Sequence, residues 1–197
     1  MDKQVRVSVV FQKNYAATTK IVVNQGSSRS GKTYSILQLL ILVKAMDERD
    51  AVFTIVRKTM PSLKASAMRD FFEILKTEEL YDERNHNKTE NTYLLNGNLF
   101  EFVSLDQREK KRGAKRTYLF INEANELSLE DWIQLSIRTE KQIFIDYNPS
   151  MEEHWIYDLV IPRADCTFIQ STYLDNKAFL PVEVVKEIEQ LKYVDEN

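Results

Sequence analysis

Short apolar runs alternate along this chain with longer segments whose apolar residues recur at helical spacing. Such short runs, bounded by turn residues, indicate buried strands, and the longer periodic segments indicate helices. We predict strands at residues 21–23, 52–56, 117–121, 142–147 and 166–172, and helices at residues 34–43, 62–75, 129–137, 153–159 and 182–192. The alternation favours a three-layer α/β fold, in which a mainly parallel sheet lies between two layers of helices.

One region departs from this alternation. Residues 92–95 and 99–103 are apolar runs that flank Asn96-Gly97. Asn-Gly is the strongest short-range signal for a β-hairpin, because both residues tolerate a positive φ. We therefore predict an inserted β-hairpin here, with a loop before it at residues 76–91 and a basic loop after it at residues 107–115.

Composition narrows the chemistry that the chain can perform. The chain has 197 residues, a length that suits one domain. Its net charge of −3 gives no strong overall attraction to nucleic acid. It contains one cysteine and two histidines. Cys166, His86 and His154 are too few for a disulfide framework or a metal cluster of cysteines and histidines. No apolar run is long enough to cross a bilayer, and the N-terminus lacks a signal sequence. We expect an intracellular protein without a membrane partner and without a metal held by cysteines and histidines.

A phosphate-binding motif lies between the first strand and the first helix. It reads Gly26-Ser27-Ser28-Arg29-Ser30-Gly31-Lys32-Thr33 and matches G-x-x-x-x-G-K-[ST]. A glycine-flanked turn before a helix directs backbone N–H groups at phosphates, Lys32 adds a positive charge, and the Thr33 hydroxyl is a ligand for Mg²⁺. A serine-rich surface loop is the alternative, but it explains poorly why the segment joins two apolar elements so tightly.

A second candidate element is the strand that ends at Asn122-Glu123. Polar groups at the carboxyl edge of a parallel sheet face its ligands, so Glu123 is the candidate general base for a water molecule that attacks the γ-phosphate. An acid usually precedes this base and holds the hydration shell of Mg²⁺, but Asn122 stands there. Its amide oxygen can accept from metal-bound water without adding charge, so we expect Thr33 and Asn122 at the metal. Alternatively, the pair only opens a surface loop.

Several motifs in the same order resemble the N-terminal ATPase domain of phage terminase large subunits. They are the phosphate loop with its internal arginine (28–33), the Walker B segment (121–127), a coupling motif (146–149), a late signature (171–176) and a basic pair (57–58). The resemblance covers nearly the whole chain and implies a RecA/ASCE-like P-loop NTPase fold. It also implies a single ATPase domain over residues 1–197, without the RNase H-like nuclease domain of the family and therefore without nuclease activity.

The resemblance also implies roles for single residues. Arg29 would neutralise the γ-phosphate, unless it is a solvated loop charge, and Asn148 would sense that phosphate, unless Asn-Pro only ends the strand. Within the basic run 108–116, Arg112 would reach the ATP of a neighbouring subunit; DNA contact and a solvated loop are the alternatives. Gln12 is a weaker candidate for contact with adenine.

The implied function is Mg²⁺-dependent ATP hydrolysis that powers the packaging of double-stranded DNA into a procapsid. The implied setting is the host cell cytoplasm, with the portal protein and the small terminase subunit as partners. Self-association into a ring is also implied, weak or absent for the isolated domain. Two other functions stay open. A small-molecule kinase would need an acceptor site and an arginine-rich lid, and a nucleotide-binding regulatory module without turnover would suit the neutral Asn122.

Overall fold

The computed structural model describes residues 5–106, 115–149 and 153–192. Its centre is an eight-stranded sheet with the order β3-β4-β5-β2-β6-β7-β1-β8. All strand pairs from β5 to β8 are parallel, whereas β3 and β4 pair antiparallel. The strands are β1 (Ile21–Gly26), β2 (Val52–Arg57), β3 (His86–Asn87), β4 (Thr92–Leu95), β5 (Asn98–Ser104), β6 (Tyr118–Ile121), β7 (Ile143–Tyr147) and β8 (Cys166–Ser171).

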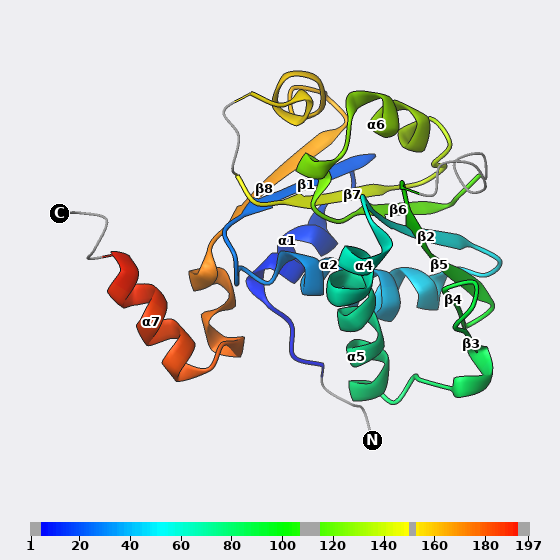
Figure 1. Ribbon diagram of the computed structural model, residues 1–197, viewed down its shortest axis with the longest axis horizontal. Helices are drawn as coiled ribbons and strands as arrows, with labels where there is room; N and C mark the ends of the chain where they lie inside the picture. Colours follow the sequence, from blue (N-terminus) through cyan, green and yellow to red (C-terminus); the bar gives the residue numbers. More distant parts are fainter. Residues whose placement is uncertain (1–4, 107–114, 150–152, 193–197) are drawn as a thin grey trace.

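Helices cover both faces of this sheet, as Figure 1 shows. One face carries α1 (Val9–Ala16), α2 (Lys32–Leu39), α4 (Met60–Leu63) and α5 (Arg69–Thr77), and the other carries α6 (Leu129–Ser136) and the wide helical turn Ile156–Val160. Leu40–Lys44 and α3 (Ala45–Asp47) prolong α2, Lys64–Met68 joins α4 to α5, and 3₁₀ turns lie at Glu83–Asn85, Ala124–Glu126 and Tyr173–Phe179. The helix α7 (Val182–Lys192) extends beyond the β8 edge. The predicted three-layer α/β fold is confirmed. No helix in the described ranges is both long and apolar enough to span a membrane.

The predicted hairpin is confirmed and belongs to the main sheet. Asn96 and Gly97 have φ values of 54° and 77°, the backbone that a tight Asn-Gly turn requires. Because β5 also pairs in parallel with β2, the hairpin widens the sheet instead of standing apart from it. The segment 76–91, which we predicted as a loop, contributes the short strand β3 at its end.

The pattern analysis missed α1. The Ser8 side chain accepts a hydrogen bond from Phe11 N and so caps this helix. Asn14 and Asn24 exchange amide hydrogen bonds of 2.8 Å in both directions, which fixes α1 against β1. The Ser8 cap and the contact with β1 therefore stabilise α1, although its apolar residues do not recur at helical spacing.

Aromatic packing holds α5 against the sheet. Phe71 is fully buried, and its ring centroid lies 4.9 Å from that of Phe100 and 5.1 Å from that of Phe102. Phe53 stacks on Phe100 at 4.5 Å and continues this cluster towards the centre of the sheet. Such rings supply a large apolar area with a defined geometry. The position of α5 therefore depends on Phe71.

Replacing Phe71 by alanine tests this dependence. We expect Phe71→Ala to lower the free energy of unfolding by about 3–5 kcal/mol, because a large apolar side chain is lost and a cavity remains. Phe168→Ala is the matched control, since Phe168 lies in β8 and is 38% exposed; we expect a loss below about 1 kcal/mol there. Equal losses in chemical denaturation would contradict the assignment of Phe71 as the anchor of α5.

Candidate functional site

The predicted phosphate loop connects β1 to α2 in a tight turn. Gly31 has a φ of 77°, in the left-handed region, and a side chain there would approach Asn176 Cγ to 2.7 Å. A Cβ on Gly26 would lie only 2.5 Å from the carbonyl oxygen of Ser171. Asn176 Nδ2 in turn donates to the Arg29 carbonyl at 3.0 Å. The segment after β8 therefore packs directly on the loop, and both glycines are needed for this close approach.

Lys32 begins α2 and is only 6% exposed. Its Nζ donates to Asn148 Oδ1 at 2.6 Å and to the Ser27 carbonyl at 3.3 Å. Burial lowers the pKa of Lys32, although the carboxylates of Asp146 and Glu123 act in the opposite direction. The ammonium group is thus held by polar partners beside the loop, where an anion would find it.

A buried carboxylate, Asp146, lies behind Thr33. Asp146 is the penultimate residue of β7, whose residues are all buried, and it has no exposed surface. Thr33 Oγ1 donates to Asp146 Oδ2, and Asp146 Oδ1 accepts from the Glu123 backbone N–H at 2.8 Å and from Asn122 Nδ2 at 2.9 Å. Burial raises the pKa of Asp146, against the opposing effects of Lys32 and of these hydrogen bonds. The sequence analysis quoted Asp146 within the coupling motif and did not predict it as a site residue; its place at the carboxyl end of an apolar strand was the available signal.

Asn122 and Glu123 follow β6 at the same edge of the sheet. Asn122 is 1% exposed, its Nδ2 faces Asp146, and its Oδ1 lies 3.0 Å from Ser66 Oγ. Glu123 has a φ of 52°, a strained backbone for a residue with a side chain, and this conformation carries it to the wall of the cavity. Burial and then the charge of Asp146 raise the pKa of Glu123.

Arg57, one of the predicted basic pair, supports Asn122 from outside the cavity. Its Nη1 donates to Ser66 Oγ at 2.9 Å, and its Nη2 pairs with Glu126 Oε1 at 2.9 Å. Burial alone would lower the pKa of Arg57, but the hydrogen bond and charge of Glu126 raise it. The guanidinium therefore stays charged and fixes the hydroxyl that Asn122 contacts.

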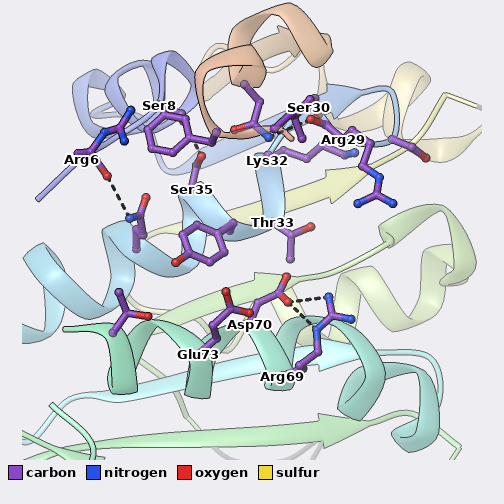
Figure 2. A pocket seen from close by; sticks show the side chains of 18 of the residues that line it. Arg6, Ser8, Arg29, Ser30, Lys32, Thr33, Ser35, Arg69, Asp70 and Glu73 are labelled. Atoms are coloured by element: carbon purple, nitrogen blue, oxygen red, sulfur yellow. Dashed lines mark hydrogen bonds and ion pairs between the residues drawn. The ribbon is translucent and has the colours of Figure 1, made fainter. Parts of the chain in front are cut away.

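These groups border a cavity of about 880 Å³. Figure 2 shows Lys32 and Thr33 on one side of it and Asp70 and Glu73 of α5 on the other. At its far end the Arg6 guanidinium lies 5.2 Å from the centroid of the Phe179 ring. The lining residues are Arg6, Ser8, residues 28–35, Gln38, Arg69, Asp70, Glu73, Thr77, Glu78, Glu123, Asn148, Asn176 and residues 179–181.

Most of the predicted site residues meet at this cavity. Ser28, Arg29, Ser30, Gly31, Lys32, Thr33, Glu123 and Asn148 all line it. Gly26, Ser27 and Asn122 lie behind the lining, where they shape the loop, hold Lys32 and contact Asp146. Gln12 is exposed on α1 and does not line the cavity, and sequence reasoning missed Arg6 and Phe179, which do. Arg112 lies outside the described residues.

Comparisons with solved structures give the same fold. The large terminase of a thermophilic bacteriophage, in complex with ATP-gamma-S, matches with a TM-score of 0.77 and 16% identity over 93% of this chain and 49% of that chain. The Thermus phage P74-26 large terminase ATPase domain matches with a TM-score of 0.59 and 15% identity over 91% of this chain and 90% of that one. The Phi-28 gp11 DNA packaging motor matches with a TM-score of 0.51 and 10% identity over 81% of this chain and 58% of that one.

This chain spans about half the length of the terminase from the thermophilic bacteriophage, so these likenesses establish the fold of this part alone. No curated protein sequence matches the chain significantly. The family model described as phage terminase large subunit matches residues 18–197, which is nearly the whole chain. The match includes the phosphate loop, Asn122-Glu123 and Asp146. The chain therefore belongs to the phage terminase large subunit family.

Proposed function

We propose that this chain is the ATPase part of a viral DNA-packaging motor, which hydrolyses ATP with Mg²⁺ to drive double-stranded DNA into a procapsid. One observation carries the proposal. In a member of the terminase large subunit family, a phosphate-loop lysine, its threonine and a glutamate from a different strand line the same cavity. This combination suits phosphate binding and attack by water at one place.

The phosphates of ATP would occupy the loop side of the cavity. Backbone N–H groups at the start of α2 and the Lys32 ammonium favour negative charge there. Asn148 accepts from Lys32 at 2.6 Å, so a γ-phosphate would compete for the same proton and free the Asn148 amide. This exchange supports Asn148 as the residue that senses the γ-phosphate. Arg29, also at the cavity, would neutralise charge on the transferred group.

Mg²⁺ fits the oxygen-rich region around Thr33. Hydroxyl and carboxylate oxygens are the ligands that this hard cation prefers, and the Thr33 hydroxyl lies at the cavity wall. When bound, Mg²⁺ neutralises charge on the β- and γ-phosphates. The base of the nucleotide would reach the Arg6 and Phe179 end, where a guanidinium and an aromatic ring offer flat surfaces.

Glu123 would act on the attacking water. In this step the Glu123 carboxylate takes a proton from water, the water oxygen bonds to the γ-phosphorus, and the bond to the bridging oxygen breaks. The products are ADP and phosphate. Arg112, from a neighbouring subunit, is the further arginine that we propose for a ring.

The partners of the motor are part of the proposal. They are double-stranded DNA, the portal protein, the small terminase subunit and further copies of this chain, in the host cell cytoplasm. Membership of the terminase family disfavours a small-molecule kinase and a regulatory module without turnover. Release of phosphate without any added acceptor would separate the motor from the kinase.

Lys32→Ala tests nucleotide binding. Hydrogen bonds to charged groups contribute about 1.5–3 kcal/mol, so we expect ATP affinity to fall about 10-fold to 100-fold or more. Titration with a fluorescent ATP analogue measures this loss, and thermal unfolding checks the fold. Lys64→Ala removes an exposed lysine outside the cavity and is the matched control. Unchanged affinity in Lys32→Ala would remove the phosphate-loop assignment.

Glu123→Gln tests the role of the base. The two side chains are nearly isosteric, so ATP affinity should stay within a few-fold of the wild-type value. Loss of a general base typically costs about 10²-fold or more, and we expect kcat to fall on that scale. Release of inorganic phosphate in steady state measures kcat. If Glu123→Gln hydrolyses ATP at a rate close to wild type, another group is the base.

A further inference from the structure

The buried Asp146 of β7 forms hydrogen bonds with three groups of the candidate site. Its carboxylate meets Thr33 Oγ1 in the phosphate loop and, after β6, both Asn122 Nδ2 and the Glu123 backbone N–H. Thr33 lies between Asp146 and the cavity. A carboxylate thus stands directly behind the hydroxyl that is expected to bind Mg²⁺.

Asn122 turns its amide nitrogen, and not its amide oxygen, towards Thr33 and Asp146. Its Nδ2 points towards Asp146 at 2.9 Å and lies 3.5 Å from Thr33 Oγ1. Its oxygen instead meets Ser66 Oγ, which accepts from Arg57. An ionised carboxylate only accepts hydrogen bonds, so the amide of Asn122 must turn its nitrogen to Asp146. In this orientation Asn122 donates to the acid beside it and offers no lone pair to a metal or its waters.

The strand order brings the two residues together. Ile121, the last residue of β6, pairs with Ile145 of β7; Asn122 follows β6 directly, and Asp146 is the next residue of β7. β7 lies between β6 and β1, so Asp146 also pairs with Asn24, before the phosphate loop. An acid was expected immediately before Glu123, but here the carboxylate lies on the neighbouring strand β7, from which it contacts Thr33.

We propose that Asp146 is the acid of the Mg²⁺ site, and that Asn122 is a positioning residue that orients it. Asp146 supplies the negative charge that holds Mg²⁺ beside Thr33, a role that Asn122 lacks the charge to fill. This inference rests on the proposed nucleotide site. A purely structural Asp146, which only ties β6 to β7, is the competing explanation.

The test measures how much Mg²⁺ strengthens nucleotide binding in the full chain. A fluorescent ATP analogue is titrated in excess Mg²⁺ and in EDTA, and Mn²⁺ binding in the presence of ATP is followed by electron paramagnetic resonance. In Asp146→Asn we expect the gain in affinity from Mg²⁺ to fall by about 10-fold or more, the scale for groups that support a metal ligand. Affinity in EDTA should stay within a few-fold of wild type, and bound Mn²⁺ should decrease.

A double variant transfers the negative charge from position 146 on β7 to position 122 after β6. Asn122→Asp with Asp146→Asn keeps one carboxylate in the pair, and residue 122 is within reach of Thr33. We expect the double variant to recover most of the Mg²⁺ effect. If Asp146→Asn alone fails to fold, the gain in affinity from Mg²⁺ is compared between the double variant and wild type. Asp158→Asn, which neutralises an exposed carboxylate outside the cavity, is the charge control and should retain the Mg²⁺ effect.

The outcomes separate the competing explanations. An Asp146→Asn variant that loses affinity equally with and without Mg²⁺ would overturn the proposal in favour of a structural role. A folded double variant without the Mg²⁺ effect would overturn it too. If the wild-type chain binds no nucleotide at all, the proposed function itself fails, and this result is distinguishable from both others.

Discussion

The burial of one carboxylate constrains the whole site. Asp146 is removed from water, and a buried charge is costly unless hydrogen bonds or opposite charges compensate it. Thr33 supplies one of those hydrogen bonds from the phosphate loop, and Asn122 and the Glu123 backbone supply the others from the end of β6. Their positions follow from this requirement. The phosphate loop, the end of β6 and the end of β7 are therefore held in one arrangement by the same group.

The strain at Glu123 is a consequence of this arrangement. A left-handed φ of 52° costs free energy in a residue with a side chain, and the 2.8 Å hydrogen bond from its N–H to Asp146 offsets that cost. The turn carries Glu123 out of the sheet edge to the cavity wall. Without an acceptor at position 146, no hydrogen bond from the Glu123 N–H to this side chain would compensate the strained turn after β6.

Local signals made part of the site predictable. The phosphate loop depends on glycines and on neighbouring elements that are close in sequence, and the hairpin depends on Asn96-Gly97 and the apolar runs beside it. The role of Asp146 is not local, because it depends on β7 lying between β6 and β1. Sequence reasoning looked for the acid immediately before Glu123 and found Asn122. For the same reason α1, which packing on β1 stabilises, was not predicted.

The hydrogen bond between Lys32 and Asn148 adds a further constraint on ligand binding. Burial disfavours a bare ammonium group, and Asn148 Oδ1 at 2.6 Å keeps Lys32 satisfied. A phosphate that enters the loop exchanges one acceptor for another, so the ammonium need not be desolvated again. The opposite wall carries Glu73 and the ion pair of Arg69 with Asp70, so its net charge is negative and repels an anion. Attraction at the loop and repulsion at α5 together favour one orientation of a polyphosphate, with its charged end beside Lys32.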